Sequence, residues 1–69
     1  MELSVRNQLT GTVESIKEGG VVAEVVVKLD GGQEIVSVIT VSSVQRLGLV
    51  VGKKVTALVK STEVMLATS

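Results

Sequence analysis

Valine-rich segments with strand alternation dominate this chain and restrict what it can fold into. In the run VVAEVVVKL, residues 21–29, every position on one face of a strand is apolar: Val21, Ala23, Val25, Val27 and Leu29. The opposite face is half apolar, because Val22 and Val26 alternate there with Glu24 and Lys28. Strands that are apolar on both faces need cover on both faces. We therefore expect part of this cover to come from another chain.

Further strands follow the same alternation. Residues 33–40, QEIVSVIT, and residues 54–60 repeat it, and VMLA at 64–67 predicts a short closing strand. The glycine pairs in EGG at 18–20 and DGG at 30–32 are typical of hairpin turns. The chain is therefore expected to form an antiparallel meander from about residue 9 to residue 40.

One segment has a helical pattern instead. In SSVQRLG, residues 42–48, Ser42 and Gln45 have the spacing of a capping box, and Gly48 stands where a C-terminal cap belongs. Three strands, a short helix and two more strands give the order of a mainly β, OB-like five-stranded barrel. The helix then lies between the third and fourth long strands of a single domain, residues 1–69.

The size of the chain also favours assembly. A domain of 69 residues buries only roughly 60% of its unfolded surface. Without cysteine or histidine it has neither disulfides nor a zinc site to add stability. Its hydrophobic fraction is 45%, with sixteen valines and no aromatic residue, which is a large aliphatic surface for a small monomer. We therefore predict a homo-oligomer.

Composition argues against several classes of function. No apolar run reaches the roughly 18 residues of a membrane span, and the N-terminus lacks the pattern of a signal peptide, so we expect a cytoplasmic protein without a membrane partner. Seven basic and seven acidic residues give no net field to attract nucleic acid, and no aromatic platform is available for stacking bases. The carboxylates are scattered and suggest no catalytic pair, so we do not expect an enzyme or a catalytic cofactor.

Hydrogen-bond donors at the ends of the predicted elements are the informative polar residues. If residues 4–6 form a strand, Ser4 and Arg6 point to the same face. Thr40 and Ser43 flank the start of the helix, while Lys60 and Ser61 close the fourth long strand. Taken singly, each has a purely structural interpretation as a helix cap, a solvated strand end or a turn residue. Together they form a set of donors with two cations and no carboxylate, which favours an anion.

Four segments carry a family resemblance: SVRNQLTG, VVAEVVVKLDGG, VITVSSVQRLGL and LVKSTEVMLA. In order and almost without gaps, they resemble the molbindins, the small Mop proteins that bind molybdate and tungstate, and the related TOBE domains. The resemblance implies an OB-like barrel, a hexamer built as a trimer of dimers, and oxyanion sites at subunit interfaces. It further implies a role in intracellular molybdenum storage or homeostasis, with no bare metal cation bound.

The resemblance also implies the site residues. Ser4, the backbone N–H of Val5, and Arg6 from one chain are expected to meet residues contributed across an interface: Thr40, Ser43, Lys60 and Ser61. The family usually has alanine where this chain has Val5, and a backbone contact is compatible with that change. Two other classes of function remain open from the residues alone. One is an interaction module without a ligand, and the other is a nucleic-acid-binding OB domain.

Overall fold

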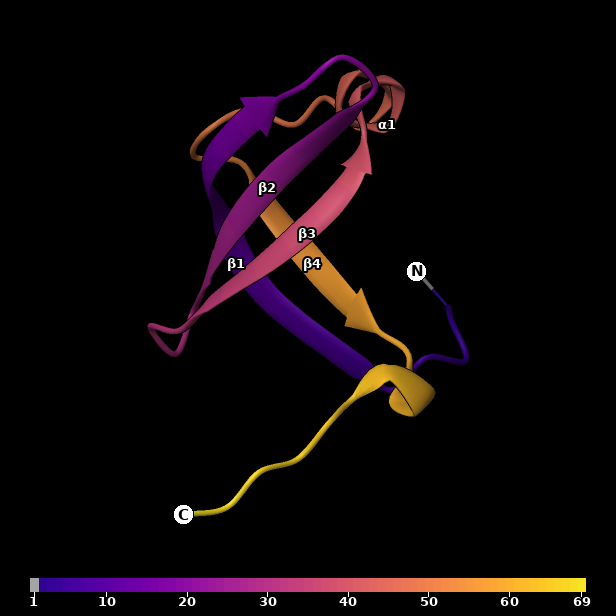
Figure 1. Cartoon of the computed structure of the whole chain (residues 1–69), viewed down its shortest axis with the longest axis vertical. Coiled ribbons are helices and arrows are strands. Elements are labelled where there is room, and N and C mark those ends of the chain that lie inside the picture. The colour runs from indigo at the N-terminus through magenta and orange to yellow at the C-terminus, as the bar shows by residue number, and fades with distance from the viewer. Residues whose placement is uncertain (1) are drawn as a thin grey trace.

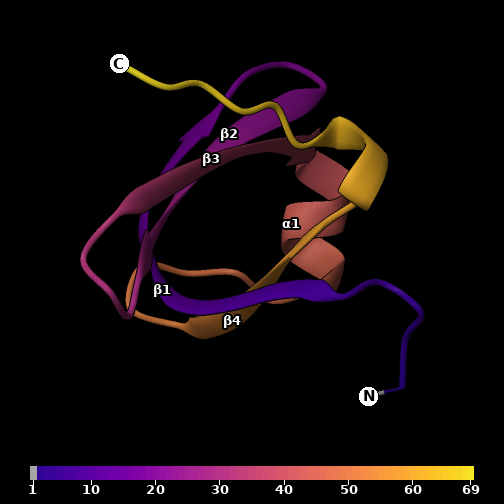
Figure 2. The same ribbon diagram turned by 90° about the horizontal axis from the view of Figure 1, so that it is seen from below.

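A single antiparallel sheet with strand order β3-β2-β1-β4 curls into a half-barrel (Figures 1 and 2). The structure is a computed structural model and describes residues 2–69. Its elements are β1 (Asn7–Glu18), β2 (Val22–Leu29), β3 (Glu34–Thr40), α1 (Val41–Arg46), β4 (Lys54–Val59) and a single 3₁₀ turn, η1 (Ser61–Glu63). The predicted mainly β, OB-like architecture, with its short helix between the third and fourth long strands, is confirmed.

Strand β1 is the centre of the sheet because it pairs with β2 on one side and with β4 on the other. At Gly11, β1 and β2 lie so close together that an added Cβ would be 2.5 Å from the carbonyl oxygen of Lys28. Only glycine fits at that position. Further along, Val13 pairs with Val27 but Ser15 pairs with Val26, so Glu14 is the extra residue of a β-bulge. The bulge shifts the alternation by one residue and turns Ile16 toward the same side as Val13.

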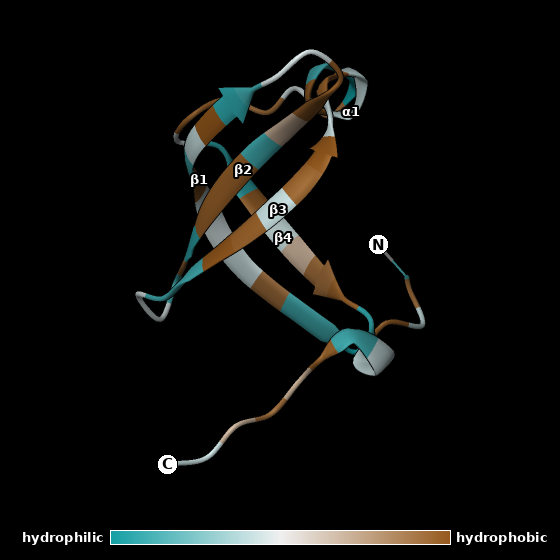
Figure 3. Ribbon diagram, in the orientation of Figure 1, coloured by the Kyte–Doolittle hydropathy of each residue, from teal (hydrophilic) through white to brown (hydrophobic). Residues whose placement is uncertain are grey.

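The core is built almost entirely from valine. Five hydrophobic side chains are buried: Val13, Ala23, Val25, Val27 and Val44. Partly buried aliphatic side chains from every strand and from α1 pack against them. As expected from the alternation, the apolar face of β2 points inward, and Val25 and Val27 are at most 5% exposed. The outer face of β3 remains exposed, with Val36 at 58% and Val38 at 64%. Figure 3 shows that most of the β3 ribbon is hydrophobic. This is the uncovered second face that the sequence predicts.

The turns and helix caps follow from particular residues. Both glycine hairpin turns are confirmed, between β1 and β2 and between β2 and β3. The N-cap of helix α1 lies two residues earlier than the sequence predicts: it is Thr40 rather than Ser42, and Thr40 Oγ1 accepts a hydrogen bond from Ser43 N. At its other end Gly48, with φ of 63°, allows a Schellman motif in which Gly48 N donates to Gln45 O and Leu49 N to Val44 O.

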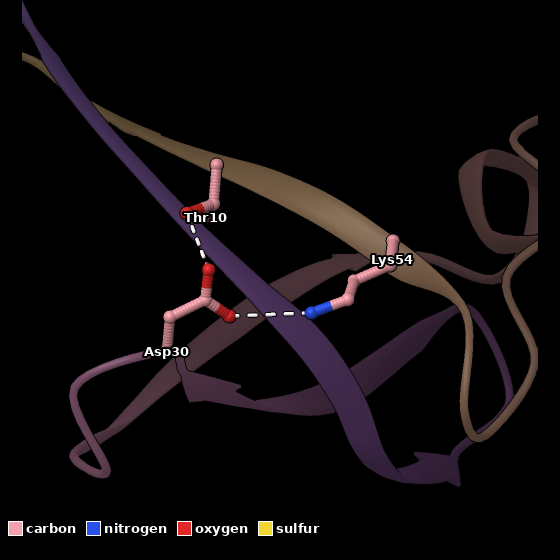
Figure 4. Close-up of polar contacts among 3 residues, drawn as sticks. All are labelled: Thr10, Asp30 and Lys54. Carbon is pink, nitrogen blue, oxygen red and sulfur yellow. Dashed lines mark hydrogen bonds and ion pairs between the residues drawn. The ribbon is translucent and has the colours of Figure 1, made fainter.

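A polar cluster on the outer face links β1, β4 and the turn after β2 (Figure 4). Thr10 Oγ1 donates a hydrogen bond to Asp30 Oδ2 at 2.9 Å, and Lys54 Nζ lies 3.3 Å from Asp30 Oδ1. The hydrogen bond from Thr10, together with Lys54, lowers the pKa of Asp30. The cluster therefore fixes the turn after β2 against β1 and β4.

The barrel remains open between its two edge strands, β3 and β4. The predicted closing strand at 64–67 is wrong for the single chain: these residues form no strand and are exposed. A strand needs a neighbour to satisfy its backbone groups, and the segment after η1 leads away from the sheet (Figure 1). The chain thus forms four of the five predicted strands. Within residues 2–69, no helix is long and apolar enough to cross a membrane.

Candidate functional site

Both cations of the predicted set lie at one end of the sheet. Asn7 pairs with Val59, and Asn7 Nδ2 donates a hydrogen bond to Val59 O at 3.1 Å. Arg6 immediately precedes Asn7 and Lys60 immediately follows Val59, so the antiparallel pairing brings the two residues to the same end of the sheet. Both are exposed, and within residues 2–69 neither takes part in an ion pair. Two positive charges are therefore available at this end without a carboxylate partner.

The segment before β1 is not a strand. Residues 4–6 precede β1, with a bend at Ser4, so the conditional prediction of a strand that would place Ser4 and Arg6 on one face is wrong. Val5 is half-buried, and its carbonyl oxygen accepts a hydrogen bond from Gln8 Nε2 at 2.8 Å. This contact folds the segment back on the start of β1. Ser61 begins η1, directly after Lys60, and is exposed.

Thr40 and Ser43 form a second cluster at the start of α1. Thr40 Oγ1 lies 2.9 Å from Ser43 Oγ and accepts from Ser43 N at 3.0 Å. Arg46 Nη2 donates to Ser43 Oγ at 3.4 Å. Sequence reasoning missed Arg46, although its position three residues after Ser43 on a helix was the available signal. The second cluster thus has its own cation.

The two clusters lie at opposite ends of the molecule. Strand β1 is 12 residues long, and the Arg6–Lys60 cluster adjoins its first residue. Its last residue, Glu18, pairs with Ala23, which pairs with Ile39, the residue before Thr40. Figure 1 shows α1 and η1 at opposite ends of the long axis. One chain therefore does not bring all seven predicted residues around one small anion.

Several other cations are already engaged. Lys54 contacts Asp30, and Lys53 Nζ donates to the carbonyl oxygens of Leu47 and Gly48 at the end of α1. These lysines have structural partners, in contrast to Arg6 and Lys60. The nearest carboxylate after Lys60 in sequence is Glu63, in η1, whose backbone N–H donates to Lys60 O. Sequence reasoning left Glu63 out, and its charge is relevant to any anion bound beside Lys60.

Carboxylates do not gather into a metal site. Within residues 2–69, no group of three acidic side chains is placed to hold a metal ion. One pair of carboxylates does interact: Glu14, at the bulge, and Glu34 on β3. Hydrogen bonding to Glu34, desolvation and the like charge of Glu34 raise the pKa of Glu14, while Lys28 opposes the shift. The pair lies away from both donor clusters along the chain.

Comparison with known proteins identifies the family. The model of the TOBE domain matches residues 3–66, which is nearly the whole chain. The chain belongs to the TOBE domain family. A relative named molybdenum-pterin-binding protein 2, from Clostridium pasteurianum, is 50% identical over 66 residues, covering 96% of this chain and 97% of that protein. The predicted resemblance to Mop proteins and TOBE domains is thereby confirmed.

Solved structures agree with this TOBE assignment. A molybdate-binding protein from Sporomusa ovata has a TM-score of 0.92 at 47% identity, covering 99% of this chain and all of that chain. The cytoplasmic molybdate-binding protein ModG, in a form with molybdate bound, has a TM-score of 0.85 at 48% identity. That match covers 88% of this chain and 43% of the ModG chain. The half-barrel is therefore a fold shared with proteins that bind molybdate.

Proposed function

We propose that this TOBE domain binds molybdate or tungstate at sites between the subunits of a homo-oligomer, for molybdenum storage or homeostasis in the cytoplasm. The names of the relatives support the class of ligand. The observation that carries the proposal is the pair of exposed cations at one end of the sheet, Arg6 and Lys60, which form no ion pair in the part of the chain that the structure describes. A tetrahedral dianion carries two charges, which this pair can neutralise.

The remaining predicted residues supply neutral donors. Hydroxyl groups of Ser4, Ser61, Thr40 and Ser43, with the backbone N–H of Val5, can orient the oxygens of the anion. Because Thr40 and Ser43 lie at the far end of the chain from Arg6, a site that uses all of these donors must combine two copies. Arg6 and Lys60 already lie at the same end of the sheet within one chain, so the second copy is needed for the hydroxyl donors of α1 rather than for charge.

An assembly also accounts for the uncovered apolar surface. Val22, Val36 and Val38 on the outer face of the sheet are each about half exposed or more. Surfaces of this kind on a small domain mark interfaces. We propose a hexamer built as a trimer of dimers, and sedimentation equilibrium at micromolar concentration tests this. A stable, folded monomer under those conditions would rule out both the assembly and the sites between its subunits.

The donor set also predicts which anions bind. Phosphate near neutral pH keeps at least one proton, which needs an acceptor, and a pocket of donors leaves that hydroxyl poorly satisfied. Sulfate has the right charge but is smaller. We therefore expect tight binding of molybdate and tungstate, weak binding of sulfate and least binding of phosphate in titration calorimetry at constant ionic strength. Equal binding of phosphate and molybdate would contradict the donor-only site.

A further inference from the structure

Arg46 places a positive charge at the end of the molecule opposite Arg6 and Lys60 (Figure 1). It is the last residue of α1 and is exposed, and within residues 2–69 it forms no ion pair. The helix itself contains no acidic residue. Lys53, the other cation beside α1, differs because its ammonium group donates to the carbonyl oxygens at the end of the helix. Arg46 therefore remains available to a negatively charged group from outside the chain.

The guanidinium group of Arg46 lies back along the helix against Ser43. Residues three apart share one face of a helix, and helical side chains lean toward the N-terminus, so Arg46 reaches Ser43. Arg46 Nη2 donates to Ser43 Oγ at 3.4 Å. In the described part of the chain, this is the only hydrogen bond made by its five N–H groups. The other N–H groups are free to donate to a ligand beside Ser43.

The hydrogen bonds around Ser43 leave this cluster with little capacity to accept. The hydroxyl groups of Thr40 and Ser43 together carry two protons and four lone pairs. One proton and one lone pair are used between the two oxygens, which are 2.9 Å apart, while a second lone pair accepts from Ser43 N and a third from Arg46. One proton and one lone pair remain, beside a guanidinium group with unused donors. The cluster therefore mainly donates, which suits an anion without protons.

We propose that Arg46 is an anion-binding residue, which adds a third positive charge when α1 of one copy meets Arg6 and Lys60 of another copy. The inference deepens the proposed function and rests on it, because it places the anion beside Ser43. The distances allow a shared contact. An anion oxygen about 2.7 Å from Ser43 Oγ can also lie about 2.9 Å from Arg46 Nη2, since these two donor atoms are 3.4 Å apart.

A third cation changes which anions the site prefers. Arg6 and Lys60 already match the two charges of molybdate, so Arg46 is not needed for neutrality and gives the site an excess of positive charge. Because Coulomb energy scales with the charge of the anion, a dianion gains about twice as much from Arg46 as a monoanion of the same shape. Arg46 therefore favours molybdate over a tetrahedral monoanion such as perrhenate.

Arg46 also has a purely structural interpretation. A basic side chain in the last turn of a helix interacts favourably with the helix dipole, and Arg46 is the basic residue of the last turn of α1. That role would stabilise the free protein without distinguishing anions of different charge. The two interpretations differ in a measurable ratio, which is the affinity for molybdate divided by the affinity for perrhenate.

Titration calorimetry of the full chain at constant ionic strength tests the inference with both anions. Arg46→Gln removes the charge, and we expect the affinity for molybdate to fall roughly tenfold or more and the affinity for perrhenate to fall by a smaller factor. Arg46→Lys keeps the charge without the guanidinium fork and should recover part of the loss. Thermal melts without anion confirm that each variant is folded.

Gln45→Glu is the matched control. It changes the net charge by the same amount as Arg46→Gln, on the same helix, but about 100° away around the helix axis. We expect it to lower the affinity for molybdate much less than Arg46→Gln does. Where perrhenate binds too weakly to titrate, this comparison decides.

Three results would overturn the inference. One is an unchanged affinity for molybdate in Arg46→Gln, and another is an equal loss in Arg46→Gln and Gln45→Glu, which would reduce the effect to net charge. The third is a loss by the same factor for molybdate and perrhenate, which would leave Arg46 with a structural role alone. A wild type that binds neither anion contradicts the proposed function as well. Tight binding of molybdate by the wild type and by Arg46→Gln alike contradicts only the role of Arg46.

Discussion

Asn7 and Val59, 52 positions apart in the chain, are directly paired at one end of the sheet, where Asn7 Nδ2 donates to Val59 O. The pairing fixes where the chain enters β1 and where it leaves β4. As a result Arg6, just before β1, and Lys60, just after β4, lie at the same end of the sheet. Nothing in the local sequence around either residue indicates this placement. The charge of the proposed anion site is set by this pairing.

Replacing Arg6 should weaken anion binding strongly. Arg6→Ala leaves the anion short of a charge-assisted partner, and we expect a loss of about 2 to 5 kcal/mol of binding free energy. Arg6→Lys should recover only part of this loss, because an ammonium group cannot reproduce the guanidinium fork. Titration calorimetry with molybdate measures both variants.

Thermal melts test independently whether molybdate binding depends on Arg6. Molybdate at 100 times its dissociation constant should stabilise the wild type by roughly 2.7 kcal/mol per independent site and raise its melting temperature. Lys17→Ala removes a charge at the far end of β1 and should keep the full shift. A full shift in Arg6→Ala would show that the site lies elsewhere.

Thr40 offers a way to separate helix capping from anion binding. Thr40→Asp keeps a good N-cap, so the free energy of unfolding without ligand should stay within roughly 0.5 kcal/mol of the wild type. The new carboxylate repels a dianion, and we expect molybdate affinity to fall tenfold or more, about 1.4 kcal/mol. Thr40→Ala is the complementary variant because it removes the N-cap side chain, and its free energy of unfolding should be about 1 kcal/mol lower than that of the wild type. Unchanged affinity in Thr40→Asp would limit Thr40 to its capping role.

Gly11 should be intolerant of any side chain. In Gly11→Ala the new methyl group meets backbone atoms of β2, and we expect a loss of about 1 to 3 kcal/mol in chemical denaturation. Gly31→Ala is the matched control, because a Cβ there has open space around it. Equal stability of the two variants would mean that β1 and β2 can separate at this point without cost.

The Glu14–Glu34 pair predicts a pH effect of a definite sign. Because the folded state raises the pKa of Glu14, it holds that proton more tightly than the unfolded state. The stabilising contribution is present at acidic pH and is lost as pH rises through the raised pKa. Glu14→Gln should therefore melt higher than the wild type at pH 7 and lose less stability between acidic and neutral pH. A Glu14→Gln variant that keeps the wild-type pH dependence of stability would contradict this prediction.

Alternation predicted most of the fold because the inward positions of β2 and β4 are uniformly apolar, and those of β3 are apolar apart from Ser37. It did not predict the bulge at Glu14, since the one-residue shift in β1 depends on pairing with β2 and leaves only a weak trace in the spacing of Val13 and Ile16. The fifth strand was misassigned for a related reason. VMLA has the composition of a strand, but a strand also needs an edge to pair with, and the single chain does not bring one to residues 64–67.

The candidate site was less accessible to sequence reasoning. The sequence shows which residues can donate hydrogen bonds, and the resemblance to Mop proteins indicates which of them form the site. Spacing along the chain, however, does not show which donors lie at the same end of the sheet. The placement of Arg6 and Lys60 at the same end of the sheet follows from the β1–β4 pairing. The distance of Thr40 from these two residues follows from the length of β1. Arg46 was missed because its partner is a side chain on the same helix rather than a turn or strand end.

The strand order has a consequence for how the chain folds. Strands β1, β2 and β3 are joined by tight hairpins and can form from contacts close in sequence, whereas β4 reaches β1 only by closing a loop that links residues as far apart as Asn7 and Val59. Loop closure of this length costs conformational entropy before any contact offsets it. We therefore expect a three-stranded meander to form early and the docking of β4 to limit the folding rate. The two cations of the anion site would then become neighbours only in the last step of folding within the chain.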